Sequence, residues 1–161
     1  MKYNKIVPEI MVDLGEHTTF DDDKSPTKNV VHLHINLEMW FGDDLLENHP
    51  CHIVTERLKN ALEKSSFTGF SFHEMEVTLD TYFEDNYHLD IPLPVFYWMK
   101  VIGKENKDDL YVSDGTLNIS TQLLKYLQEN FSIENADINP ERNEFDDLID
   151  KMFEDRKNKK D

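Results

Sequence analysis

One stretch constrains the fold of this chain more than any other: residues 39–55, which read MWFGDDLLENHPCHIVT. It joins an alternating pattern before it to a helical pattern after it, so we expect a hinge between a strand and a helix. Trp40 and Phe41 can bury a large apolar area together. Gly42 permits a tight turn that other residues resist, and the two aspartates that follow it are suited to hydrogen-bond backbone amides at the bend.

Four segments outside this stretch predict strands. Residues 30–37 and 70–83 alternate between apolar and polar side chains, the pattern of a half-buried strand. Residues 95–102 are apolar on both faces and are expected to lie inside a sheet. Residues 4–14 are interrupted by Pro8, which favours an edge strand or an extended entry segment. Shorter strands are expected near residues 53–54, 110–112 and 131–138.

Three amphipathic patterns predict helices, because their apolar residues recur three or four positions apart. The first is expected to follow Thr55, a suitable N-cap, and to end near Lys64. The second covers residues 118–131 with Ser120 as its cap, and the third covers residues 144–156 and is expected to pack across the sheet. We find no internal repeat in the sequence.

These elements predict the fold class. The length of 161 residues fits one domain. We expect a single α+β domain over residues 1–156, with a mixed or mainly antiparallel sheet and about three packed helices. Residues 157–161 are expected to form a frayed basic tail.

The charge balance restricts the choice of partners. The chain holds 33 acidic residues against 17 Lys and Arg, for a net charge of −16. Such a negative field repels nucleic acid and anionic membranes, because binding to phosphates requires Lys and Arg. It attracts cations and basic protein surfaces. The plainer interpretation is that the charge serves solubility alone, and we expect no cofactor.

Cysteine usage and hydropathy point to the cytoplasm. Cys51 is the single cysteine, so no internal disulfide forms, and its apolar neighbours indicate a small buried side chain. Residues 1–11 lack the apolar block of a signal peptide. No apolar run approaches the roughly 20 residues of a membrane helix.

The acids are distributed unevenly, and this distribution suggests an interaction surface. Residues 65–99 contain no Lys or Arg, and two tyrosines are interleaved with the acids there. Aromatic side chains rimmed by charge are typical of protein–protein interfaces. A solvated acidic face is the alternative, and a homodimer is left open. The candidate partner-binding residues are Asp80, Tyr82, Glu84, Asp85, Tyr87 and Asp90.

His32 and His34 give the sharpest signal of an enzyme. They share one face of a predicted strand, so both imidazoles can reach one metal ion. An exposed polar face or a packed pair is the commoner role of such histidines. Other residues considered as ligands are His49, His52, Asp43 and Asp44. The carboxylate pairs Asp43/Asp44 and Asp108/Asp109 are suited to acid–base chemistry, although aspartates at turns usually bond local backbone.

Several motifs resemble a family of small bacterial proteins, some of which are grouped with the immunity proteins of polymorphic toxin systems. The motifs are W-x-G-D-D-L-L-E, P-C-x-I-V-T-x-x-L, G-F-x-F, P-x-F-x-W-x-x-V-x-G, D-D and V-S, all between Met39 and Ser113. Phe41 departs from the small aliphatic residue expected after the tryptophan. The resemblance brings no catalytic residues.

What the resemblance implies is a role in binding. An immunity protein binds its toxin tightly and blocks the active site, and toxins that cleave nucleic acid are commonly basic. We therefore expect a cytoplasmic, non-catalytic immunity-type protein whose acidic face covers a basic toxin. The alternatives are a metal-dependent enzyme that uses His32 and His34, and an interaction module unrelated to toxins.

Overall fold

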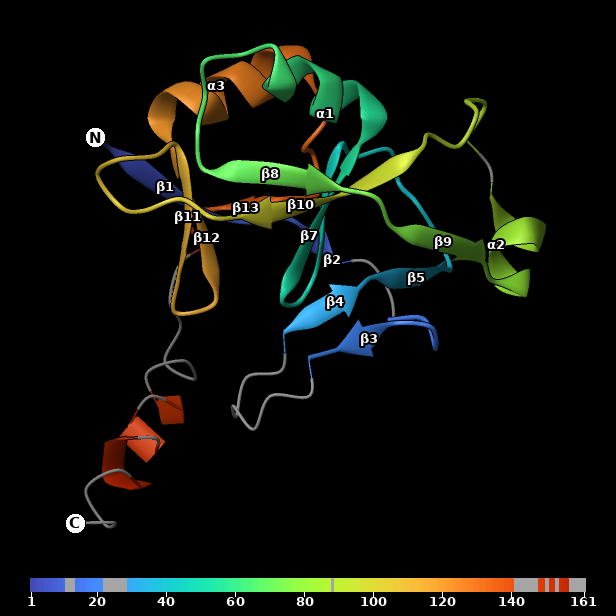
Figure 1. Ribbon diagram of the computed structural model, residues 1–161, viewed down its shortest axis with the longest axis horizontal. Coiled ribbons are helices and arrows are strands. Elements are labelled where there is room, and N and C mark those ends of the chain that lie inside the picture. The colour runs from blue at the N-terminus through green and yellow to red at the C-terminus, as the bar shows by residue number, and fades with distance from the viewer. Residues whose placement is uncertain are drawn as a thin grey trace.

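The computed structural model describes residues 1–10, 14–21, 29–87, 89–140, 148–149, 151–152 and 154–156 (Figure 1). The strands, in chain order, are β1 (Tyr3–Val7), β2 (Glu9–Ile10), β3 (Thr19–Phe20), β4 (Val30–His32), β5 (His34–Leu37), β6 (Leu45–Asn48), β7 (Cys51–Thr55), β8 (Phe70–His73), β9 (Glu76–Leu79), β10 (Phe96–Val101), β11 (Leu110–Ser113), β12 (Thr116–Ser120) and β13 (Asp137–Ile138). The helices are α1 (Glu56–Glu63), α2 (Thr81–Asn86) and α3 (Thr121–Asn130).

The strands form two larger sheets and two small ones. One large sheet has the order β11-β12-β1-β13, and the other has the order β2-β6-β7-β10-β8. Neighbouring strands in these sheets are antiparallel except for β2 and β6. The small sheets pair β3 with β4 and, in parallel, β5 with β9. The predicted α+β class with a mainly antiparallel arrangement is confirmed.

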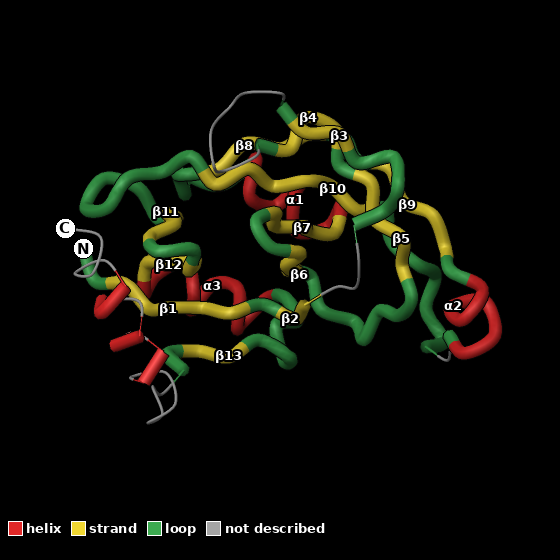
Figure 2. Tube along the Cα trace, turned by 90° about the horizontal axis from the view of Figure 1, so that it is seen from below, coloured by secondary structure: helices red, strands yellow, loops and turns green. Residues whose placement is uncertain are grey.

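Two apolar cores hold these layers together. Helices α1 and α3 lie side by side over the large sheets (Figures 1 and 2) and bury their leucines in a shared core. The second core lies on the other face of the five-stranded sheet, where Trp98 packs with Ile35, Trp40 and Phe83. Because β7 and β10 contribute to both cores, the five-stranded sheet is the central layer of the fold.

The strand registers reveal an internal repeat that inspection of the sequence missed. The hairpin β6–β7 leads into α1 and then β8, and the hairpin β11–β12 leads into α3 and then β13. Leu45 pairs with Val54 in the first hairpin, and Leu110 pairs with Ile119 at the equivalent position of the second. The helices begin alike, with Thr55 and Ser120 as N-caps.

The two repeats exchange their first strands. Strand β1 begins the first half of the chain but lies between β12 and β13 of the second half. Strand β10 begins the second half but lies between β7 and β8 of the first half. The registers correspond, since Tyr3 faces Ser120 and Phe96 faces Thr55. Each large sheet is therefore built from both halves of the chain.

Two buried aspartates join the halves a second time. Asp44 accepts hydrogen bonds from the Thr55 hydroxyl at 2.6 Å and from the Ser132 amide at 2.8 Å. Asp109 does the same in the other direction, accepting from the Ser120 hydroxyl at 2.6 Å and from the Thr68 amide at 3.0 Å. Each aspartate thus bonds the cap of its own helix and the segment that follows the other helix.

The beginning of the chain and the hinge differ from prediction. Strand β1 lies inside its sheet and is not an edge strand. After Pro8 the chain passes to the other large sheet, where β2 forms an edge. The bend at Gly42 has the expected positive φ of 104°, but β6 follows it and the helix begins later. Trp40 is buried, whereas Phe41 is 56% exposed.

Several predicted elements are shorter or divided. The strand over residues 70–83 is wrong in its second part, because Asp80 accepts the amide of Tyr82 and starts helix α2. The helix over residues 118–131 begins at Thr121, since residues 116–120 pair as β12. Residues 131–138 form a strand only at β13.

The strand predicted over residues 30–37 is divided by Leu33 into β4 and β5. The central position of β10, the Thr55 cap and the end of α1 at Lys64 are confirmed.

The predicted C-terminal helix is only partly within the described residues. Positions 148–149, 151–152 and 154–156 are helical. Leu148 and Met152 are 54% and 52% exposed, so this side of the helix does not pack across a sheet as expected. The rest of that helix and the basic tail over residues 157–161 lie outside the described residues.

Candidate functional site

The predicted partner-binding residues gather on and beside α2, at one end of the molecule (Figure 1). Tyr82, Glu84, Asp85 and Asp90 are exposed. Leu79 and Ile91 flank the helix and are also exposed. We call these six exposed residues the α2 surface. It combines three carboxylates with one aromatic and two aliphatic side chains.

Asp80 and Tyr87, which were predicted as contact residues, have roles inside the protein. Asp80 caps α2 through its Oδ1 atom, and its Oδ2 atom accepts a hydrogen bond from Asn36. Tyr87 stacks on Phe83 at 4.7 Å, and its hydroxyl donates to the Ile91 carbonyl. Burial raises the pKa of the Tyr87 hydroxyl. These two residues hold α2 in place rather than offering free groups.

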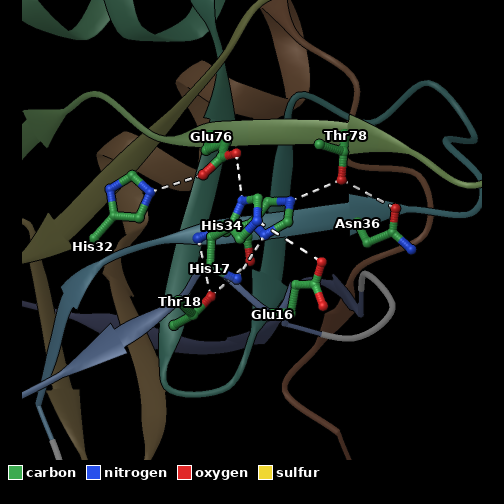
Figure 3. Close-up of polar contacts among 8 residues, drawn as sticks. All are labelled: Glu16, His17, Thr18, His32, His34, Asn36, Glu76 and Thr78. Atoms are coloured by element: carbon green, nitrogen blue, oxygen red, sulfur yellow. Dashed lines mark hydrogen bonds and ion pairs between the residues drawn. The ribbon is translucent and has the colours of Figure 1, made fainter.

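A second group of polar residues surrounds Glu76, and we call it the His–Glu cluster: His17, His32, His34 and Glu76 (Figure 3). The Glu76 Oε1 atom lies 2.8 Å from His17 Nδ1, and its Oε2 atom lies 3.0 Å from His32 Nε2. The His17 and His34 rings stack at 4.7 Å. Strands β4, β5 and β9 and the turn before β3 supply these four residues.

Hydrogen bonds define the state of His34, which is buried. Its Nδ1 atom accepts from the His17 amide at 3.1 Å. Its Nε2 atom lies 2.8 Å from the Thr78 hydroxyl, which itself donates to Asn36. These roles correspond to a neutral imidazole with its proton on Nε2. Gly15 leaves room for this ring, because a Cβ there would lie 2.1 Å from Nδ1.

Hydrogen bonds within the cluster shift the pKa values of Glu76 and His17. Hydrogen bonds from His32 and then His17 lower the pKa of Glu76 to about 2. The hydrogen bond to Glu76 raises the pKa of His17 above its usual range. Glu76 is therefore a carboxylate at neutral pH, held between two imidazoles.

The alternative of a metal site on His32 and His34 is not matched by the geometry of the described residues. Three ligand atoms, one each from His17, His34 and Glu76, lie within 4.8 Å of one another, and His32 is not in that set. The residues considered as completing ligands lie elsewhere. Asp43 and Asp44 bond the segment after α3, and the Glu47 carboxylate approaches His52 at 3.7 Å and His49 at 4.0 Å.

The two carboxylate pairs have structural partners. Asp43 accepts from the amide of Asn135 at 2.9 Å, and Asp108 accepts from the amide of Lys104 at 2.8 Å. Asp44 and Asp109 hold the two halves together, as described above. Cys51 is buried, as predicted, and burial raises the pKa of its thiol to about 11, which makes it a poor nucleophile.

Sequence reasoning missed His17 and gave Glu76 no particular role. His17 stands in a segment that lacks any periodic pattern, and Glu76 was one acid among many. The spacing of Glu76, Thr78 and Asp80 on one side of an expected strand was the available signal. It became informative only once β9 was seen to pair in parallel with β5, which aligns His34 with Glu76.

A chain of hydrogen bonds connects the His–Glu cluster to α2. His34 bonds Thr78, Thr78 donates to Asn36, and the Asn36 amide donates to Asp80 at 3.2 Å. Asp80 in turn caps the helix. The cluster and the α2 surface are thus parts of one polar network along the β5–β9 pair.

We expect His52 to make stability depend on pH. Burial, and to a lesser extent the charge of His49, lowers its pKa to about 4. The unfolded chain takes up this proton near pH 6.5, the ordinary pKa of histidine, so the contribution to stability is present above 6.5 and is lost as pH falls toward 4. As pH falls from 6.5 to 4, wild type should lose up to about 3 kcal/mol of unfolding free energy that His52→Gln does not lose.

The measurement for His52 is urea unfolding at several pH values. Glu9, whose pKa burial raises to about 7, titrates in the same range and is common to both proteins, so it cancels in the comparison. The exposed His73→Gln serves as the control. Parallel pH profiles for wild type and His52→Gln would contradict the assignment.

No helix among the described residues is both long and apolar enough to cross a membrane. No protein-family model, curated protein or solved structure matches the chain.

Proposed function

We propose that the protein is a cytoplasmic immunity-type protein that binds a basic bacterial toxin through the α2 surface and covers the toxin's active site. The observation that carries this proposal is the exposure of Tyr82, Glu84 and Asp85 together on α2. The mechanism is steric occlusion and needs no chemistry from this chain.

Charge supports a basic partner. The chain has a net charge of −16, and residues 65–99, which include α2 and both its flanks, contain no Lys or Arg. A basic protein would be steered to such a surface, so its association would be fast at low salt and slower as salt screens the charges. Tyr82 is 55% exposed and is suited to be the aromatic anchor of the interface.

The shape of the site supports binding by a preorganised surface. Asp80 caps α2 and Tyr87 packs under it, so the helix is fixed before a partner arrives. Preorganisation lowers the entropy lost on binding. The resemblance to immunity proteins in residues 39–113 adds the class of partner, a toxin.

The experiment begins with capture of partners from the bacterium that encodes the protein, at low and at moderate salt. We expect a basic protein that is toxic when expressed alone and harmless when co-expressed with this chain. The double variant Glu84→Lys/Asp85→Lys should lose protection, and its association rate should fall by about tenfold or more.

The matched control is Glu129→Lys/Glu134→Lys, which changes the net charge equally at exposed positions in and after α3. It should keep protection. Equal loss in both variants, or an association rate that ignores ionic strength, would overturn the role of the α2 surface. A captured partner that is not toxic would favour an interaction module instead.

A further inference from the structure

We propose that His17, His34 and Glu76 form a binding site for a divalent transition-metal ion, with Zn²⁺ as the test ion. One ligand atom from each residue lies within 4.8 Å of the other two. The ligands on a tetrahedral zinc ion are about 3.3 Å apart. Closing the site therefore requires side-chain shifts of about an ångström, and no change of fold.

The donor set fits this class of ion. Two imidazoles and one carboxylate suit zinc and its neighbours in the first transition row, whereas Ca²⁺ and Mg²⁺ favour oxygen ligands alone. His34 Nδ1 carries a lone pair, since it accepts the amide of His17, and Glu76 offers two carboxylate oxygens. The proton now between Glu76 and His17 would be released on binding.

The surroundings resemble the supporting shell of a metal site. His32 bonds the second oxygen of Glu76 at 3.0 Å and so fixes the plane of the carboxylate. Thr78 bonds Nε2 of His34 at 2.8 Å and fixes that ring. Such partners orient ligands and raise metal affinity, so His32 acts here as a positioning residue instead of the ligand considered as an alternative from the sequence.

Two details define the movement that coordination requires. His34 Nδ1 now accepts the amide of His17, so a metal bond at Nδ1 replaces that hydrogen bond. The His17 and His34 rings are 22° from parallel, so His17 has to tilt before both lone pairs can meet one ion. His17 is 56% exposed and belongs to a turn, where such a tilt is inexpensive.

A metal ion has access to the site. A cavity of about 380 Å³ borders His34 and is also lined by Glu16, Asn36 and Thr78. This cavity does not reach His17 or Glu76, whose side chains are 56% and 35% exposed, so an ion enters from the solvent side. Three protein ligands leave a fourth position, which a solvent water can occupy.

The alternative is that the four residues only bridge the strands by hydrogen bonds. The two alternatives can be told apart by measurement, because residues that only bridge strands are not expected to bind a transition-metal ion selectively.

The test is isothermal titration of the chelator-treated full chain with Zn²⁺ at neutral pH, together with Co²⁺ absorption as a report on coordination. We expect one ion per chain, and binding weakened by about tenfold or more in His32→Ala. His17→Ala and Glu76→Gln should abolish it. His73→Ala, which removes an exposed histidine outside the cluster, should bind as wild type.

His17→Ala is the decisive variant, because its exposed side chain can be removed without opening a core. Retained binding in folded His17→Ala, no stoichiometric uptake by wild type, or equal weakening in His73→Ala would each overturn the proposal. Absorption typical of nitrogen-ligated Co²⁺ that is lost in His17→Ala would support it. These results do not depend on any toxin, so they stand apart from the test of the α2 surface.

Discussion

Replacing Asp44 with alanine is expected to lower the free energy of unfolding by about 3 to 5 kcal/mol. Asp44 is 4% exposed and accepts hydrogen bonds from the Thr55 hydroxyl and the Ser132 amide. It also pairs with the Arg57 guanidinium. Alanine would leave the Thr55 hydroxyl and the Ser132 amide, which lie in different halves of the chain, without their acceptor. The Arg57 side chain is 62% exposed and can turn to water, so its loss adds little.

Asp109→Ala should lower the free energy of unfolding by about 2 to 4 kcal/mol. This is slightly less than for Asp44, because the partners of Asp109, Ser120 and Thr68, are neutral. Equilibrium unfolding in urea measures both effects. Asp44→Asn keeps one acceptor oxygen and should recover part of the loss. Glu129→Ala, at an exposed position on α3, should change stability by no more than about 0.5 kcal/mol. If Asp44→Ala matched this control, the aspartate would not join the halves.

The second large effect concerns the exchanged strands. Fragments 1–90 and 91–161 are each expected to be unfolded alone and to form a folded complex when mixed. The first fragment lacks β10, which separates β7 from β8, and the second lacks β1, which separates β12 from β13. Each fragment therefore has a gap inside its large sheet, with strand edges and core residues exposed.

Circular dichroism of each fragment and of the equimolar mixture measures this expectation. The control is a first fragment with Ile6→Asp, which places a charge at a β1 position that is 1% exposed in the shared core. It should fail to restore structure in the second fragment. A cooperative unfolding transition in either fragment alone would show that the halves are independent.

The sequence predicted those features that depend on neighbouring residues. The caps Thr55 and Ser120 were found because a cap acts on amides two or three positions away. The central strand β10 was found because both of its faces are apolar. The run of acids and aromatics over residues 80–90 was visible in the sequence, but only the structure places part of it on helix α2 and separates the exposed Tyr82 from the packed Tyr87.

The features that were missed depend on pairing between distant segments. The repeat was missed because few residues are identical between its two copies: Asp43-Asp44-Leu45 recurs as Asp108-Asp109-Leu110, but Pro50 and Gly115 occupy equivalent turns. The helix caps are Thr55 in one copy and Ser120 in the other.

The His–Glu cluster was missed as a group because its residues come from distant segments. The pairing of β5 with β9 aligns His34 with Glu76, and His17, from the turn before β3, bonds Glu76 there.

The exchange of strands has a consequence for synthesis on the ribosome. Strand β1 is made before the other described strands, yet its neighbours β12 and β13 follow much later in the chain. Tyr3 cannot pair with Ser120 until β12 has been made. At about 5 to 20 residues per second, that wait lasts on the order of ten seconds. The five-stranded sheet is complete once β10 has been made, but the edges of β1 stay open until β12 and β13 follow. The nascent chain should therefore be a client of the chaperones that shield such edges.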